Sequence, residues 1–248
     1  MAVLTGRPIL VIENEEGGGP AQLADAAAAA GLELDVRAAG TDPIPDRLGD
    51  AAGLVVLGAT YGVRDAPERP HLYREMDLLR EAAATGRPAL GICLGGQLAA
   101  EALGGRVERA PEGPEIGWLT VRATEEAAGD PVAAAVGAGT PLFMWHHDVF
   151  TPPTGAVRLL TSDGSPNQGF RVGTVWGVQS HPEVSPGLLA EWCRSPGGSA
   201  DLEAAGISPD DLLGPAEESS RRARRLLDAW CAVVARSPAG PRGSTRVR

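Results

Sequence analysis

The stretch "PALGICLGGQLAAEALGG", residues 88–105, restricts the fold more than any other part of the sequence. Its apolar start, 88–92, is typical of a buried strand, and a helical pattern over 97–103 follows almost at once. Cys93 stands at the corner between the two. Because a strand that runs straight into a helix is the building unit of parallel sheets, this stretch predicts an α/β fold.

Strand and helix patterns alternate through the first part of the chain, and shorter strands follow later. We expect strands at 7–13, 32–37 and 52–58 and helices at 19–31 and 69–86. This alternation predicts a central, mostly parallel sheet with helices on both faces. After Gly105, strand-like pieces at 115–123, 140–148, 156–163, 167–173 and 175–183 indicate antiparallel additions. Helices are expected at 185–195 and 214–237, with a loop over 197–214 that contains a short helix capped at Ser208.

The composition is that of an ordinary globular protein and excludes several classes of function. The chain has 248 residues, 43% of them hydrophobic, which is enough for one α/β domain with a sizeable core. Its formal net charge of −10 argues against a protein that binds nucleic acid through phosphate contacts. All 22 basic residues are arginine, so a Walker-type phosphate loop and a lysine Schiff base are both excluded.

The termini and the cysteines lead us to expect a cytoplasmic location without membrane contact. No apolar run approaches the roughly 18 residues of a membrane span, and the N-terminal stretch lacks the features of a signal peptide. The three cysteines form no disulfide framework, which indicates a reducing compartment. We expect residues 1–236 to form one domain and 237–248 to be a disordered basic tail.

The corner at Cys93 suits a nucleophile. Gly91 and Gly95 permit a tight turn, which exposes the thiol above the sheet. The helix start favours a thiolate, and the N–H of Leu94 points to where an oxyanion forms. The alternative is a small buried cysteine beside a helix start.

A cysteine nucleophile needs a base, and His181 is the candidate among the four histidines. It follows a buried-looking strand, and active-site residues of parallel sheets gather at the carboxyl ends of strands. Glu183, two residues further on, is placed to orient the imidazole. His71, in contrast, stands at a polar helix start and is interpreted as a surface residue.

The motifs "GICLGGQ" and "SHPE" resemble those of class I, or triad, glutamine amidotransferases. Within that family, "EIGW", "WHHD" and "SPNQGFRVG" make the chain most similar to stand-alone members related to the amidotransferase domain of GMP synthase. The resemblance implies a flavodoxin-like three-layer sandwich. It also implies cleavage of a γ-glutamyl amide through a glutamyl thioester, without metal or cofactor.

Carried over by position, the resemblance makes Cys93 the nucleophile, His181 the general acid and base, and Glu183 its orienting partner. The N–H of Leu94 becomes one oxyanion donor, and the loop at Gly58-Ala59 supplies the other. Relatives have Gly-Gly-Pro where this chain has Gly-Ala-Thr, and a left-handed backbone would be disfavoured at the alanine.

The same resemblance places substrate contacts at Gln97 and at the backbone around His146 and His147, where His147 replaces a small residue of the relatives. The alternative is that both histidines end a strand and contact nothing. Tyr61, in the loop 59–71, is expected to line the pocket together with Arg64 and Asp65; the alternative for this loop is an ordinary surface role. Trp118 and Trp145 are interpreted as pocket walls or core residues, and Cys193 and Cys231 as core residues.

Three functions stay open at this point. The protein releases ammonia from glutamine for a separate synthetase partner, or it is a free-standing hydrolase or transferase of a γ-glutamylated metabolite. The third alternative is a non-catalytic binding or regulatory relative. The expected ligand is therefore glutamine or another γ-glutamyl compound, without nucleic acid.

Overall fold

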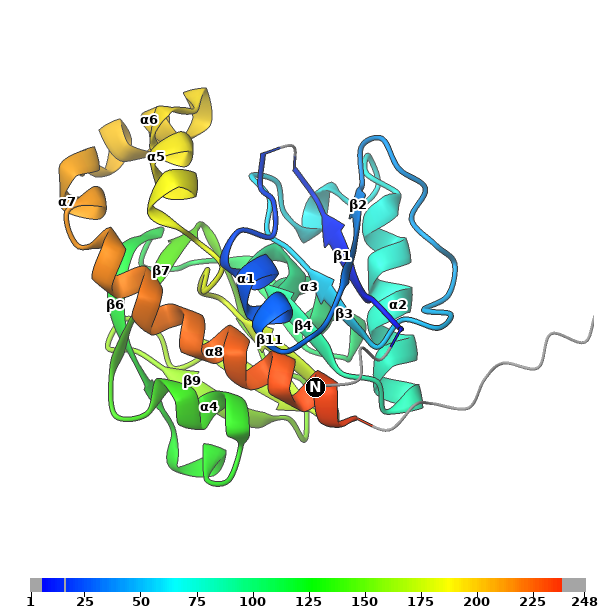
Figure 1. Cartoon of the computed structure of the whole chain (residues 1–248). Coiled ribbons are helices and arrows are strands. Elements are labelled where there is room, and N and C mark those ends of the chain that lie inside the picture. Colours follow the sequence, from blue (N-terminus) through cyan, green and yellow to red (C-terminus); the bar gives the residue numbers. More distant parts are fainter. Residues whose placement is uncertain (1–5, 16, 238–248) are drawn as a thin grey trace, which may run out of the picture.

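The computed structural model describes residues 6–15 and 17–237, and its centre is a nine-stranded sheet (Figure 1). The predicted tail falls, from residue 238 on, outside the described residues. The strands of the sheet are β1 (Ile9–Glu13), β2 (Leu34–Ala38), β3 (Gly53–Val56), β4 (Ala89–Ile92), β6 (Glu115–Ala123), β7 (Thr140–His146), β9 (Val157–Thr161), β10 (Gly169–Val172) and β11 (Val175–Val178). Their order is β2-β1-β3-β4-β11-β10-β9-β6-β7.

The sheet has a parallel half and an antiparallel half. Strands β2, β1, β3, β4 and β11 pair in parallel, while β10, β9, β6 and β7 continue the sheet with antiparallel pairs. The predicted α/β sheet with antiparallel additions is therefore confirmed. Because β3, β4 and β11 are parallel neighbours, the residues that follow them meet at one edge.

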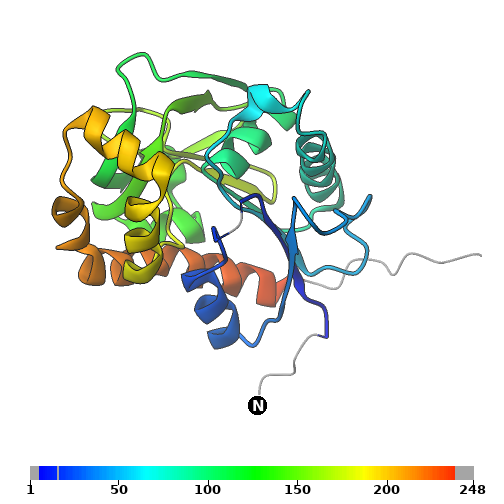
Figure 2. The same ribbon diagram turned by 90° about the horizontal axis from the view of Figure 1, so that it is seen from above.

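Helices cover both faces of the sheet (Figure 2). One face packs against α1 (Gln22–Ala29), α4 (Pro131–Val136) and α8 (Ala216–Arg236), and the other against α2 (His71–Thr85) and α3 (Leu94–Ala102). In β1, Ile9 and Val11 face the first layer while Leu10 and Ile12 face the second. This alternation is why a continuous apolar run is needed in a strand covered on both sides.

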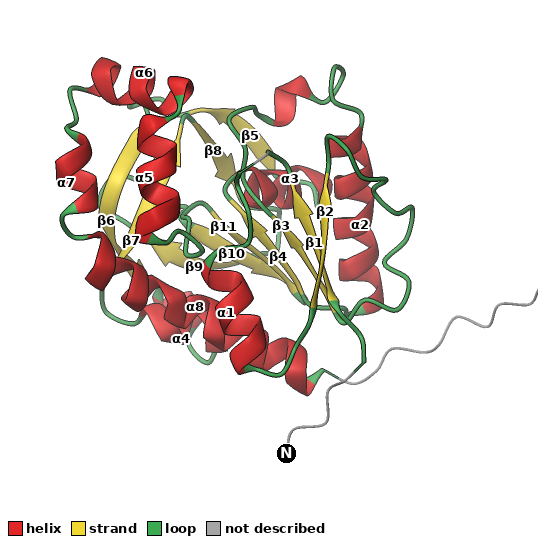
Figure 3. Ribbon diagram, turned by 45° about the horizontal axis from the view of Figure 1, so that its top comes forward, coloured by secondary structure: helices red, strands yellow, loops and turns green. Residues whose placement is uncertain are grey.

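Two further units stand beside the main sheet (Figure 3). Strands β5 (Arg106–Arg109) and β8 (Asp148–Thr151) form a separate antiparallel pair. Helices α5 (Pro186–Arg194), α6 (Pro196–Ala205) and α7 (Pro209–Leu213) pack with Phe143 of β7 in a third apolar cluster. Both units contribute to the site described below.

The structure corrects several expectations from the sequence. The sequence predicts a loop from residue 197 on, but Pro196–Ala205 form α6, because Ser195 caps the helix by accepting from Gly198 N and Leu202 is buried. Helix α3 begins at Leu94, earlier than the pattern indicated. Strands β5 and β8 and helix α4 were not predicted, since each is short and its apolar periodicity is weak.

Glycines allow α3 to approach the sheet very closely. A Cβ on Gly91 would lie 2.2 Å from the carbonyl oxygen of Gly95, and one on Gly95 would lie 2.0 Å from that of Val56. A Cβ atom cannot lie so close to backbone atoms, which have no room to move aside, so both positions require glycine. Within the described residues, no helix is both long and apolar enough to cross a membrane.

Replacement of Gly95 by alanine is expected to destabilise the fold strongly, because the new methyl group meets backbone that cannot move aside. We expect a loss of at least about 3 kcal/mol and a fall in Tm of about 6–12 °C, measured by calorimetry.

The matched control is Gly197→Ala. Gly197 is the second residue of α6, as Gly95 is of α3, but nothing lies within 4 Å of its Cβ position. Its Tm should equal or exceed that of the wild type, since alanine favours the helix. A Gly95→Ala protein with a wild-type Tm would contradict the close approach described here.

Candidate active site

Cys93 lies at the carboxyl end of β4 in a strained backbone conformation. Its φ of 51° and ψ of −109° are unusual for any residue with a side chain. Its N–H donates to the carbonyl oxygen of Val178, which ties the corner to β11. The Sγ atom lies 3.8 Å from Gln179 Nε2 and 3.9 Å from the carbonyl oxygen of Trp145. The corner therefore holds the thiol above the sheet, at the start of α3.

His181 and Glu183 lie in the segment that follows β11, and both are buried. His181 Nδ1 is 2.7 Å from Glu183 Oε1. Because a carboxylate only accepts, Nδ1 carries the proton of this hydrogen bond and Nε2 faces away from Glu183. Backbone bonds fix the segment: His181 N donates to Phe143 O, and the side chain of Gln22 donates to the carbonyl oxygens of Pro182 and Val184.

Cys93 and His181 lie around one small space beside Gly58. A Cβ on Gly58 would be 2.8 Å from His181 Cε1 and 3.3 Å from Cys93 Cβ. The absent side chain at this position therefore leaves room for both groups. The model brings together the cysteine, the histidine and the glutamate that the motifs pointed to.

The pKa of His181 is shifted strongly by its neighbours. Burial alone would lower it, but the charges of Glu183 and Cys93 and the hydrogen bonds to both residues outweigh burial and raise the pKa to about 10. The imidazolium form is therefore present at neutral pH, where it is placed to stabilise a thiolate.

Three backbone N–H groups border the same space. Those of Gly58, Ala59 and Leu94 donate to no acceptor in the part of the chain that the model describes, and all three residues line the cavity. Among the described residues with side chains, only Ala21 and Cys93 have a positive φ, so Ala59 is not in the left-handed region. The alanine in this loop therefore carries no backbone strain.

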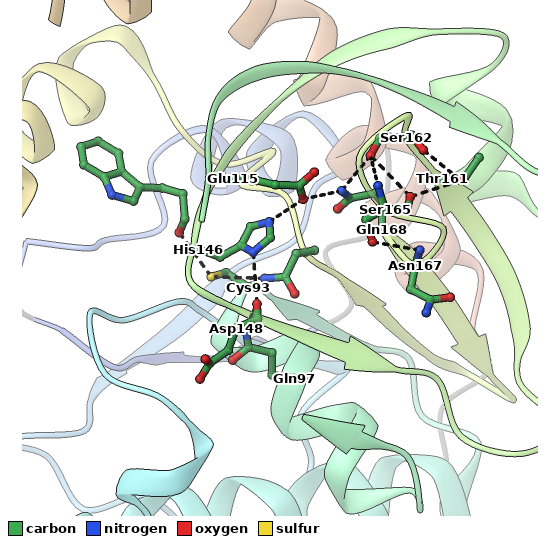
Figure 4. A network of polar contacts seen from close by, with 12 residues as sticks. Cys93, Gln97, Glu115, His146, Asp148, Thr161, Ser162, Ser165, Asn167 and Gln168 are labelled. Atoms are coloured by element: carbon green, nitrogen blue, oxygen red, sulfur yellow. Dashed lines mark hydrogen bonds and ion pairs between the residues drawn. The ribbon is translucent and has the colours of Figure 1, made fainter. Parts of the chain in front are cut away.

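Gln97 contacts the turn between β7 and β8 (Figure 4). Its Nε2 donates to the carbonyl oxygen of Asp148 at 3.0 Å, and His146 Nδ1 lies 3.1 Å from the same oxygen. This carbonyl thus fixes the turn to α3, the helix that begins at the cysteine.

His146 is held from both sides by acceptors (Figure 4). Its Nε2 is 3.0 Å from Glu115 Oε2, which also accepts from Gln168 Nε2 at 2.7 Å. Burial alone would raise the pKa of Glu115, but these hydrogen bonds lower it below its ordinary value. The alternative that this histidine contacts nothing is wrong, and its side chain serves to anchor the turn.

His147 connects the same turn to α6. The Nε2 atom of His147 is 3.0 Å from Asp201 Oδ2, which also accepts from Trp145 Nε1 at 2.9 Å. On the other side of the ring, Arg109 Nη2 lies 3.0 Å from the Nδ1 atom of His147. The alternative of no contact is wrong here too. The larger side chain at this position therefore docks α6 at the cavity edge.

Tyr61 lines the cavity, but its hydroxyl is already engaged. It donates to the carbonyl oxygen of Asn14 at 2.6 Å and lies 3.1 Å from His71 Nε2. Burial raises its pKa to about 12. His71 is thus half-buried against Tyr61 rather than purely a surface residue, and Tyr61 offers the cavity mainly its ring.

The cavity has a volume of about 720 Å³ and is larger than the predicted site residues alone define. All ten of them line it, as do Arg64 and Asp65; Trp145 lines it but Trp118 does not. Sequence reasoning missed Glu15, Arg109, Glu191, Trp192, Ser195 and Gly198, which are also part of the lining. Helix α5 was predicted, but no sequence signal placed it over the cavity. No cluster of three His, Cys, Asp or Glu side chains suited to a metal ion occurs among the described residues.

Comparisons with known proteins point to one family. The family model "Glutamine amidotransferase class-I" matches residues 21–192. A glutamine amidotransferase-like protein of Salmonella typhimurium is 32% identical over 58% of this chain and 62% of its own length. A γ-glutamyl-L-1-hydroxyisopropylamide hydrolase of Pseudomonas is 31% identical over 60% of this chain and 54% of its own. The matches thus span less than two thirds of these relatives.

A larger enzyme and a solved structure are also similar to this chain. A GMP synthase of Porphyromonas gingivalis is 33% identical over 57% of this chain, which is 26% of the synthase. The solved structure of a glutamine amidotransferase from Thermotoga maritima matches 93% of this chain and 99% of its own, with a TM-score of 0.84 and 28% identity.

Limiting iodoacetamide at pH 7 is expected to modify Cys93 before Cys193 and Cys231. Burial raises the pKa of Cys193 and that of Cys231, the latter to about 12, whereas Cys93 faces the His181 imidazolium. Glu183→Gln should slow the modification of Cys93 at least about tenfold at pH 7. Without the carboxylate, burial lowers the pKa of His181 and the ring becomes neutral. Peptide mass spectrometry over time measures both effects.

Glu218→Gln, on the exposed side of α8, is the control and should react as the wild type does. Equal rates for Glu183→Gln and wild type at pH 7 would show that the carboxylate does not set the charge of His181.

Proposed function

This chain belongs to the class I glutamine amidotransferase family, and from that premise we propose that it hydrolyses a γ-glutamyl amide through a Cys93 thioester. The observation that supports this most strongly is the arrangement around Gly58, where the Cys93 corner meets a buried His181–Glu183 pair.

The proposed reaction begins with attack of the Cys93 thiolate on the γ-carbonyl carbon of the substrate. The N–H groups of Leu94 and of the Gly58-Ala59 loop stabilise the oxyanion. As the carbon–nitrogen bond breaks, the His181 imidazolium gives its proton to the leaving amine. His181, held by Glu183, then takes a proton from water, which attacks the thioester carbon. The carbon–sulfur bond breaks, glutamate is released, and the Cys93 thiolate and His181 imidazolium are restored.

In this proposal, substrate binding uses the residues that line the cavity next to the thiol. The backbone of the turn between β7 and β8 faces the glutamyl group, and this turn is held by Gln97, His146 and His147. The ring of Tyr61 borders the glutamyl group on another side. The side chains of the two histidines position this turn rather than contact the substrate, since their ring nitrogens are engaged by Glu115, Asp148, Asp201 and Arg109.

Two candidate functions remain, and they differ in the amine that leaves the substrate. If the amine is ammonia, the protein supplies it to a separate synthetase, as resemblance to GMP synthase indicates. If the amine is larger, the protein is a free-standing hydrolase, as resemblance to the Pseudomonas hydrolase indicates. The cavity volume of about 720 Å³ favours the second candidate. A cavity of this size lies within the range of roughly 300–1,000 Å³ of pockets that take drug-sized ligands, which are larger than glutamine.

Replacement of Cys93 by alanine is expected to abolish hydrolysis of every γ-glutamyl amide while Tm changes little, because the change removes only the sulfur atom, whose polar contacts of 3.8 and 3.9 Å are long. Release of glutamate from a panel of γ-glutamyl amides, measured with the purified protein, tests this. Full activity in the variant would exclude the proposed mechanism.

His181→Asn is expected to lower kcat at least about 100-fold while substrate still binds, since general acid–base catalysis is lost but the cavity remains. Quenched-flow detection of acylated Cys93 in the wild type supplies the second readout. A loss of less than tenfold would remove His181 from the proposed role.

A further inference from the structure

We propose that Trp192 and Trp145 form a leaving-group subsite for apolar or aromatic amines, so that γ-glutamyl amides of such amines are preferred over glutamine. This inference rests on the proposed function, because the leaving amine is defined by the cleavage at Cys93. It goes further by assigning two side chains to amine recognition and by stating which amines fit.

Trp192 lies where the leaving amine departs. Its ring centroid is 4.9 Å from that of His181, at an interplanar angle of 76°, and both residues line the cavity. In the proposed reaction His181 hands its proton to the amine nitrogen. A substituent on that nitrogen therefore lies next to the indole of Trp192, where apolar and aromatic groups bury well.

Trp145 continues this surface and is rigidly held. Its ring lies 6.5 Å from that of Trp192 in a T-shaped arrangement, and its Nε1 donates to Asp201 Oδ2 at 2.9 Å. The fully buried Phe143 packs behind both tryptophans, at 6.0 Å and 6.3 Å between centroids. The two indoles thus form a fixed wall, so a ligand that binds them loses little free energy to their ordering.

Glutamine leaves this wall unused. Its leaving group is ammonia, which has no apolar surface, and the cavity of about 720 Å³ extends from Cys93 and His181 to both tryptophans. An amine with a ring or a short apolar chain extends the same substrate onto the indoles. Burial of that surface is the source of the expected preference.

Charge near the wall disfavours an anionic amine. Glu191, beside Trp192 on α5, is exposed, lines the cavity, and forms no ion pair with any residue that the model describes. The cavity arginines, Arg64 and Arg109, both lie near Asp148 instead, at 3.5 and 3.6 Å. Amino acids and peptides as leaving groups would bring a carboxylate close to Glu191, so neutral apolar amines fit better.

The test measures binding in the Cys93→Ala background, where no turnover interferes, by titration calorimetry with three ligands. These are γ-glutamylbenzylamide, L-glutamine and γ-glutamylglycine, which differ only in the amine. We expect γ-glutamylbenzylamide to bind at least about tenfold tighter than glutamine, and γ-glutamylglycine no tighter than glutamine. Equal or weaker binding of the benzylamide, or no detectable binding of it, would overturn the inference.

Variants then assign the effect to the wall. Trp192→Ala, added to the same background, should weaken binding of γ-glutamylbenzylamide at least about fivefold and leave glutamine within twofold. Trp192→Phe should keep most of the preference, because an aromatic face remains. The matched control is Trp118→Phe, since Trp118 packs on the same Phe143 at 5.1 Å but does not line the cavity. Equal losses for both ligands in Trp192→Ala and Trp192→Phe would mean that Trp192 only supports the fold.

Kinetics with Cys93 intact separate this inference from the proposed function. The ratio of kcat/KM for γ-glutamylbenzylamide over glutamine should exceed about ten and fall toward one in Trp192→Ala. Turnover of both substrates at equal kcat/KM would overturn the inference while leaving the thioester mechanism in place. Absence of any Cys93-dependent turnover would instead overturn the proposed function, and the binding data would still decide about the wall.

Discussion

The close approach of α3 to the parallel strands is the constraint on which the rest of the site depends. Gly91 and Gly95 remove the side chains that would separate helix and sheet, and Cys93 accepts a φ of 51° at the junction. This geometry places the first N–H groups of α3 and the thiol at the same edge of the sheet. The strain at Cys93 persists because packing on Val56 and Val178 fixes the backbone around it.

The segment that contains His181 lies at the same edge of the sheet, and elements distant in sequence hold it there. Its position relies on β7 through Phe143 and on α1 through Gln22. The charges of Glu183 and Cys93 then raise the pKa of His181 although the ring is buried. A charged imidazolium in such a place is stable only because both partners are built into the same space.

The antiparallel half of the sheet and helices α5–α7 shape what the site accepts. The turn from His146 to Asp148 is anchored by Glu115 on one side and by Gln97 on the other, and Asp201 joins it to α6. The resemblance in sequence covers Cys93, His181 and Glu183, the residues of the proposed reaction. The wall of Trp145 and Trp192 arises where α5 packs on β7.

The sequence by itself determined the alternation of strands and helices, the corner at Cys93 and the set of Cys93, His181 and Glu183, because glycine spacing and apolar periodicity are short-range patterns. It also predicted that Gln97 and the backbone around His146 and His147 border the cavity, but not the contacts of their side chains. Helix α6 and the positions of Trp192, Arg109 and Asp201 were decided only by the tertiary structure. Their neighbours lie on segments distant in sequence, which are brought together by packing around Phe143 and by the contacts of His147 with Asp201 and Arg109.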